Sequence, residues 1–193
     1  IFDYIAGEVF DTIDIPTRDL LCKTALFPHM TCRMAETLTG LHNADRVFSR
    51  LYRNHLFVEK HSRVDTLYQY HPLFREFLLN RFDEIYSEEE RRSMRHNAAM
   101  LLEEDGQIEA AISLYHDAGY GEDALPLIMK HAPSLLSQGR TQPLLKWLRQ
   151  LPNELLNRHP WLTYWMGACH LSIDPIVSRT YYEKAFELFE AQG

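Results

Sequence analysis

The chain of 193 residues is 46% hydrophobic and 24% charged, a composition typical of a soluble globular protein with one large or two small domains. Its formal net charge of −7 argues against a dominant nucleic-acid-binding surface, because phosphate binding normally needs an excess of lysine and arginine. No stretch reaches the roughly 20 apolar residues of a membrane span, and the start of the chain lacks the basic residues of a signal peptide. We therefore expect a soluble protein without a membrane partner.

The three cysteines, Cys22, Cys32 and Cys169, form no C-x-x-C pair and cannot all be bonded to one another. Such thiols suit a reducing cytosol, where each acts as a small core hydrophobe, so we expect a cytoplasmic location. The sequence also opens without Met and stops at Gly193 directly after a helix-like run. We expect it to be a piece of a longer protein.

Residues 1–86 contain the only convincing strand signals, set among short helices. The apolar pattern predicts helices at Ile5–Ile13, at Arg18–Phe27 with Thr17 as N-cap, and at Ala44–Asn54. Between the last two, Thr31 is expected to cap a third short helix that ends at Gly40. Two short runs, Leu56–Lys60 and Leu67–Tyr70, flank a polar turn region at His61–Thr66 and predict a β-hairpin. Pro72 then opens a helix that passes through Phe82. Several helices, a two-stranded wing and a closing helix are the pattern of a winged-helix module.

From residue 87 to residue 193 the apolar pattern is helical throughout. Ser87 and Glu90 form a capping-box signature, and the helix that they start stops at Gly106. Further helices are expected at Ile108–Ala118, Gly121–His131, Thr141–Leu151, Trp161–Leu171 and Ile176–Ala191.

Small residues recur in two of these stretches, Ala98–Met129 and Trp161–Phe189, at points where the antiparallel helices of stacked hairpins would cross. The sequence therefore predicts a mainly α protein, in which a winged-helix module with a small β-hairpin precedes a right-handed, tetratricopeptide-like (TPR-like) superhelix. An irregular helical bundle is the alternative for this second half.

Five segments carry a resemblance to a known family: FDYIAGEVFD (Phe2–Asp11), TALFP (Thr24–Pro28), RLYRNHLFVEK (Arg50–Lys60), YQYHPLFREFLLNRF (Tyr68–Phe82) and HNAAMLLEEDGQIEAAISLYHDAG (His96–Gly119). They resemble the region between the ATPase core and the effector-sensing repeats of the ATP-dependent LuxR-type (MalT-like) transcriptional regulators, which belong to the STAND class of signalling ATPases. The resemblance is strongest from Leu51 to Gly119 and weak after about Gln138.

The resemblance implies that the winged helix packs on a nucleotide-binding domain outside this sequence and helps to hold an ADP-bound resting state. It also implies that the repeats bind an unknown small-molecule inducer or a protein partner, and that DNA is bound only through a C-terminal domain outside this sequence. The chain contains no G-x-x-x-x-G-K-[ST] phosphate loop. We therefore expect no cofactor in this fragment, with ADP or ATP bound only in the intact parent protein.

His71 lies where the second strand of the wing passes into the next helix, in the order Tyr70, His71, Pro72. In the STAND proteins that this region resembles, the histidine of a Met-His-Asp motif at this place contacts the β-phosphate of ADP. An imidazole at a helix start is a reasonable anion ligand. Here Tyr70 replaces Met and Pro72 replaces Asp, so the resemblance is partial, and a histidine hydrogen-bonded for structural reasons is the other interpretation. Nucleotide sensing would operate only in the intact protein.

Arg46, Arg50 and Arg53 share one stripe of the helix before the wing. In a DNA-binding winged helix this helix enters the major groove, where arginine reads base edges. The acidic neighbours Asp45 and Glu59 weaken that interpretation, and a solvated helix face is the simplest one. A third interpretation places the arginines at the interface with the missing nucleotide-binding domain.

Trp161, Tyr164 and Trp165 follow one another too closely to share one face of a helix, so at least one is expected to face outward. An outward aromatic ring on the concave face of a superhelix could contact an effector or a protein partner. Burial in the core is the alternative for each of the three.

No catalytic residue and no metal site are predicted. The ten histidines are scattered, with no pair at metal-ligand spacing on one helix, and the cysteines lack a nucleophile signature. We therefore expect a non-enzymatic segment of a multidomain transcriptional regulator, with a winged-helix module at residues 1–86 and a TPR-like sensor domain at residues 87–193. The alternatives are a directly DNA-binding winged-helix protein with a helical dimerisation tail, and a free-standing TPR-like scaffold for protein partners.

Overall fold

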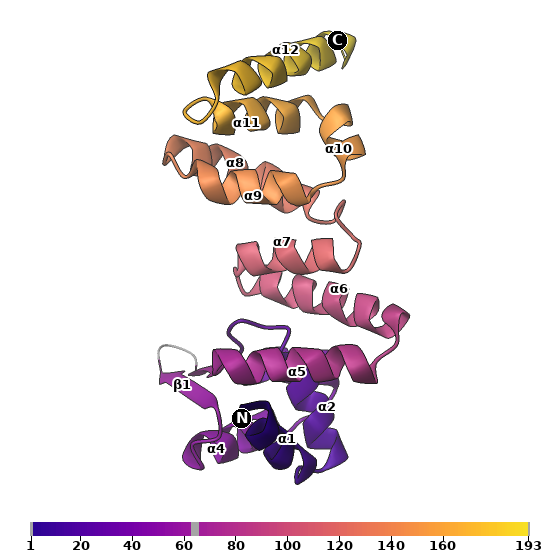
Figure 1. Ribbon diagram of the computed structural model, residues 1–193, viewed down its shortest axis with the longest axis vertical. Helices are drawn as coiled ribbons and strands as arrows, with labels where there is room; N and C mark the ends of the chain where they lie inside the picture. The colour runs from indigo at the N-terminus through magenta and orange to yellow at the C-terminus, as the bar shows by residue number, and fades with distance from the viewer. Residues whose placement is uncertain (1, 63–65, 193) are drawn as a thin grey trace. The chain divides into compact units, whose positions relative to one another are not determined.

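The computed structural model describes residues 2–62 and 66–192 of the chain (Figure 1). Contacts divide the chain into two compact units, Ile1–Gly106 (unit 1) and Gln107–Gly193 (unit 2). Unit 1 holds α1–α6 and an antiparallel pair of strands, whereas the described residues of unit 2 form helices and turns only. The expected mainly α fold with a small β-hairpin is confirmed.

The helices of unit 1 are α1 (Phe2–Asp11), α2 (Ile15–Thr24), α3 (Cys32–Thr39), α4 (Ala44–Arg53), α5 (Pro72–Ile85) and α6 (Glu88–Glu104). The strands β1 (Val58–Ser62) and β2 (Thr66–Tyr70) pair antiparallel, with Val58 opposite Tyr70, which confirms the predicted hairpin. Residues 63–65 of the predicted turn lie outside the described residues. The long helix α5 packs across α1 and α2 (Figure 1).

Aromatic side chains fill the core of unit 1. Tyr68 and Tyr70 of β2, Phe48 of α4, and Phe74 and Phe82 of α5 are each at most 2% exposed. The ring centroid of Tyr70 lies 6.3 Å from that of Phe48 and 5.8 Å from that of Phe74, both in edge-on geometry. Burial of each ring contributes on the order of 2 kcal/mol. These rings join the wing to α4 on one side and to α5 on the other.

The start of α2 corrects one prediction. Its N-cap is Asp14, not Thr17: the Asp14 carboxylate accepts a hydrogen bond from the Thr17 backbone N–H at 3.0 Å, and Pro16 lies in the first turn. Asp is a stronger N-cap than Thr, and proline is tolerated in the first turn because the N–H that it lacks would have no partner there.

Helix α6 starts where the sequence predicts, with Ser87 as N-cap and the capping box of Ser87 and Glu90 fully formed. It packs against α3, whose predicted caps Thr31 and Gly40 are also confirmed. Through this packing α6 belongs to unit 1, so the division between the compact units falls after Gly106, one helix beyond the expected boundary at residue 86.

Unit 2 consists of α7 (Ile108–Asp117), α8 (Leu125–Ser137), α9 (Thr141–Gln150), α10 (Asn153–Arg158), α11 (Pro160–His170) and α12 (Pro175–Gln192). Helix α8 packs on α9, α11 packs on α12, and α9 contacts both α7 and α11 (Figure 1). Contacts of Gly167 with Ser178 and of Trp161 with Phe189 show that α11 and α12 run antiparallel as a hairpin. The predicted helices at α7, α9, α11 and α12 are confirmed within one residue at each end.

One prediction for unit 2 is corrected, and one helix was not predicted. The helix predicted at Gly121–His131 begins at Leu125 instead, because residues 121–124 form turns and Pro126 favours a first-turn position. It continues through the exposed Pro133 to Ser137, since the buried side chains on its inner face offset the hydrogen bond that proline removes. The six-residue α10 was not predicted, because it is too short to show a helical apolar period.

Candidate functional site

His71 is held at the junction of the wing and α5 by its backbone. Its N–H donates to the Phe57 carbonyl at 2.8 Å, and its carbonyl accepts from the Arg75 N–H at 2.9 Å. The residue is exposed and occupies the N-cap position of α5, yet its imidazole does not cap the helix. The exposed side chain therefore stands at the positive end of the α5 dipole, a position that favours a bound anion.

The loop that holds the His71 backbone is strained. His55 and Phe57 have φ angles of 53° and 57°, in the left-handed region that residues other than glycine rarely adopt. Such a conformation costs roughly 1–2 kcal/mol per residue. The Phe57 ring packs on Phe74 with centroids 5.1 Å apart, which offsets part of this cost. The reversal of the backbone also explains why β1 begins at Val58, two residues later than predicted.

Arg75 lies one helical turn after His71, and sequence reasoning did not single it out. Its guanidinium donates to the Leu26 carbonyl at 3.3 Å, while its Nε is buried with no partner among the described residues. Burial lowers the pKa of Arg75. A cation at the C-terminal end of α2 is favourable, so Arg75 holds α5 against α2. Its spacing from His71 was visible in the sequence, but its burial was not.

Arg46, Arg50 and Arg53 are all exposed on α4, whereas the opposite face of the helix is buried. The Nε of Arg53 donates to the Ser49 carbonyl at 3.1 Å, and Arg50 lies at the rim of a cavity between α4 and the α1–α2 turn. Asp45 on the same helix accepts a hydrogen bond from the Tyr68 hydroxyl at 3.1 Å. The exposed face of α4 therefore carries three cations next to a carboxylate that is tied to the wing.

The aromatic residues of α11 and α12 form a partly exposed cluster made of Trp161, Tyr164, Tyr182 and Phe189. The Trp161 ring meets Phe189 edge-on at 5.2 Å, and the Tyr164 ring lies 5.3 Å from Tyr182. Trp161 is 50% exposed and Tyr164 is 39% exposed, which confirms that at least one of the predicted three faces outward.

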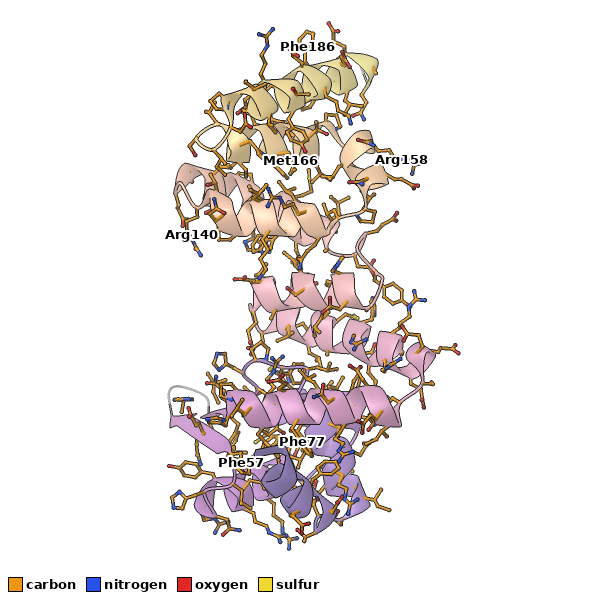
Figure 2. All side chains as sticks on the ribbon, in the orientation of Figure 1. Phe57, Phe77, Arg140, Arg158, Met166 and Phe186 are labelled. Carbon is orange, nitrogen blue, oxygen red and sulfur yellow. The ribbon has the colours of Figure 1, made fainter. Side chains whose placement is uncertain are left out.

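Trp165 differs from these two residues, because it is only 4% exposed. Its ring lies 6.2 Å from that of Trp161, so it supports the aromatic cluster from within and offers no contact surface of its own. The sequence did not single out Phe186, which is 63% exposed and projects from α12 (Figure 2).

The three thiols are poor nucleophiles. Burial raises the pKa of Cys22 to about 12, and it raises the pKa of Cys32 and of Cys169 to about 11. Each thiol is therefore protonated at neutral pH, and only the thiolate is reactive. Within residues 2–62 and 66–192, no group of three or more His, Cys, Asp or Glu side chains is placed to hold a metal ion. Across the same residues, every helix is too short or too polar to cross a membrane.

A comparison with known protein families matches residues 6–91 to the MalT winged helix domain. The match covers less than half of the chain, includes α2–α5 and both strands, and ends in the first turn of α6. It confirms the winged-helix part of the expected fold. It shows that this part of the chain is similar to the winged helix domain of MalT.

Proposed function

We propose that the chain is the regulatory and effector- or partner-sensing segment of an ATP-dependent, LuxR-type transcriptional regulator of the STAND class. The observation that carries the proposal is the match of residues 6–91 to the MalT winged helix domain, with His71 exposed where the wing meets α5. In this proposal unit 1 packs on the nucleotide-binding domain of the intact cytoplasmic protein, and unit 2 forms TPR-like repeats that bind the effector or partner.

The role proposed for His71 is to contact the β-phosphate of ADP in the intact protein. The residues on either side of His71 are compatible with this role, although they differ from the Met and the Asp of the Met-His-Asp motif. Tyr70 points into the core, where its hydroxyl lies 2.7 Å from Thr24 Oγ1, and Pro72 takes the first position of α5. Tyr70 therefore anchors the wing in the core and Pro72 starts α5, while His71 between them remains exposed.

The test of this role uses the intact parent protein. We expect His71→Ala to weaken ADP retention by roughly tenfold, the effect of losing one hydrogen bond to a charged group, and to raise basal transcriptional activity. His42→Ala is the matched control, because His42 is an exposed histidine of the same unit outside the wing junction. Equal ADP affinity in the wild type and in His71→Ala would contradict the nucleotide role and leave a structural role for His71.

A direct DNA-binding function is the second candidate, because the stripe of Arg46, Arg50 and Arg53 lies on the helix that precedes the wing. We favour an interface with the nucleotide-binding domain, since Asp45 and Glu59 are exposed beside this stripe and would oppose phosphate. A mobility-shift titration of this chain against duplex DNA separates the two functions. Tight, salt-sensitive binding to one defined duplex would favour DNA binding and contradict our proposal.

The aromatic cluster of α11 and α12 is the proposed contact surface for the effector or partner. Half-exposed rings supply contact area at a low entropic cost, and a ligand of the folded state raises apparent stability. A metabolite screen by thermal shift should yield a ligand whose effect is lost in Trp161→Ala and in Tyr164→Ala. Tyr120→Ala is the control, since Tyr120 is 40% exposed in unit 2 outside the cluster. A ligand effect that survives both cluster substitutions would place the effector site elsewhere.

The sequence that precedes residue 1 in the parent protein gives the simplest test of the STAND assignment. We expect a G-x-x-x-x-G-K-[ST] phosphate loop there. Its absence would leave a free-standing helical scaffold as the better interpretation.

A further inference from the structure

A small cavity in unit 1 lies between α4 and the turn that joins α1 to α2. Its volume is about 130 Å³. A single water needs only about 10–15 Å³, so the cavity has room for roughly ten non-hydrogen atoms. It is therefore large enough for a small organic molecule and too small for most nucleotides or drug-sized ligands.

Two opposite charges border this cavity. The Asp14 carboxylate accepts hydrogen bonds at 3.0 Å from both the backbone N–H and the hydroxyl of Thr17. These two bonds, followed by weaker contributions that include the charge of Arg50, lower the pKa of Asp14, so it is ionised at neutral pH. Asp14 therefore presents a fixed negative charge to the cavity.

Arg50 provides the positive charge. Its guanidinium attracts Asp14 electrostatically, but the two groups form no ion pair within 4.0 Å, and no hydrogen bond from Arg50 to another described side chain is found. The guanidinium fork therefore keeps its donors available for a planar acceptor such as a carboxylate.

Apolar side chains also line the cavity, together with polar ones. Val47 and Leu51 are buried side chains of α4, and Leu56 comes from the strained loop that leads into β1. Asn54, four residues after Arg50, adds an amide to the lining. The cavity therefore offers an anionic group, a cationic group and a short aliphatic surface to one occupant.

We propose that this cavity binds a small zwitterion with an aliphatic body, of the class of the aliphatic α-amino acids. The ammonium group would face Asp14, the carboxylate would pair with Arg50 and Asn54, and the side chain would lie on Val47, Leu51 and Leu56. A simple anion would be opposed by Asp14, and a simple cation would be opposed by Arg50. A neutral apolar molecule would desolvate both charges without pairing either.

This site is independent of the proposed nucleotide role of His71, although the two are close in structure. Asn54 and Leu56 line the cavity, and the next residue, Phe57, accepts the hydrogen bond from the His71 backbone. The ligand would therefore contact the strained loop that positions His71.

The test measures the melting temperature of the 193-residue chain by far-UV circular dichroism. Each measurement contains about 10 mM valine, leucine, isoleucine or methionine. At least one of the four amino acids should raise the melting temperature by about 2 °C or more. Two analogues of the most stabilising amino acid serve as control ligands. Its amide lacks the carboxylate, and its deaminated carboxylic acid lacks the ammonium group. Neither analogue should reproduce the shift.

Substitutions locate the effect. Arg50→Gln and Asp14→Asn should each abolish the shift, and Asn retains the N-cap of α2 because its side chain also accepts the Thr17 N–H. Arg46→Gln should keep the shift, since Arg46 shares the helix and the charge of Arg50 but does not line the cavity. In a ¹³C-methyl NMR titration, the resonances of Leu51 and Leu56 should move in the wild type.

Three results would overturn the proposal. The first is that none of the four amino acids raises the melting temperature. The second is that the amide or the deaminated analogue raises it equally, and the third is that the rise persists in Arg50→Gln. None of these depends on the ADP affinity of the parent protein, so this proposal and the role of His71 can fail separately.

Discussion

The ring of Tyr182 on α12 lies directly over the backbone of Gly167 on α11, so that a Cβ atom at position 167 would come within 2.9 Å of the ring. Four residues before Tyr182, the Ser178 hydroxyl donates to the Gly167 carbonyl at 2.8 Å in a buried position. The two helices of this hairpin approach closely because position 167 has no side chain. The interaction of Gly167 with Tyr182 is therefore a packing requirement, and it can be tested.

Gly167→Ala should destabilise unit 2 by about 1–3 kcal/mol, because the added methyl group must displace the Tyr182 ring from the surface of α11. All three tryptophans, Trp147, Trp161 and Trp165, lie in unit 2, so tryptophan fluorescence in a urea titration reports the unfolding of this unit. A lower urea midpoint in Gly167→Ala is the expected result.

Gly7→Ala is the control for this substitution. Gly7 also lies in a helix, but a Cβ atom there would meet nothing within 4 Å. Alanine should therefore stabilise unit 1 by about 0.5–1 kcal/mol through helix propensity alone. If both substitutions shifted stability in the same direction, the argument from the Tyr182 ring would be wrong.

His55→Gly should stabilise unit 1 by up to about 1 kcal/mol, because glycine adopts the left-handed conformation without the steric cost that a Cβ atom imposes. His55 is exposed, so little packing is lost. Phe57→Gly should instead destabilise the unit, since it removes the ring contact with Phe74. Urea titrations followed by circular dichroism should show midpoints that move in opposite directions, and a loss of stability in His55→Gly would contradict the strain argument.

The capping box of α6 predicts a dependence of stability on acid pH. Hydrogen bonds from the Ser87 hydroxyl and then from the Ser87 backbone N–H lower the pKa of Glu90 below its ordinary value of 4.5. A lowered pKa in the folded state means that this stabilisation is complete above pH 4.5 and is lost as the pH falls through the folded-state pKa. Glu90→Gln should therefore remove part of the acid destabilisation seen in the wild type.

Glu89→Gln serves as the control for the capping box, because Glu89 lies in the same first turn but outside the box. Urea midpoints measured from pH 3 to pH 7 on the three proteins make the comparison. A pH profile of Glu90→Gln that coincides with those of the wild type and of Glu89→Gln would show that the box does not couple α6 to pH.

Trp165→Ala and Trp161→Ala should differ strongly in stability although the two residues are neighbours on one helix. Trp165 is 4% exposed, so its truncation should cost about 3–5 kcal/mol. Trp161 is half exposed, and its truncation should cost well under half of that. Similar urea midpoints for the two variants, measured by circular dichroism, would mean that Trp161 is a core residue and that the aromatic cluster is not a contact surface.

Local patterns predicted much of the fold correctly. The caps at Thr31, Gly40 and Ser87 were identified from single residues, because a cap acts on backbone groups within three or four positions. One mistake occurred where two local signals compete. Asp14 and Thr17 are both good N-caps, and the sequence does not say which of them accepts the hydrogen bond.

The candidate site was less predictable than the fold. The position of His71 between strand and helix followed from the pattern of the wing, whereas the strained loop at His55 and Phe57 has no sequence signature, since neither residue is glycine or asparagine. The cavity between Asp14 and Arg50 joins residues 36 positions apart, and no periodicity connects them.

The sequence alone determined most of the segments that form helices and strands, although not α10, and it indicated a winged helix at the start of the chain. These properties depend on apolar periodicity, proline, glycine and capping side chains, whose effects are confined to one or two turns. Only the tertiary structure decided that α6 packs with unit 1, that Trp165 is buried while Trp161 is exposed, and that Asp14 and Arg50 line one cavity. Each of these depends on which helix faces are covered by other helices, and a local pattern does not contain the identity of the covering helix.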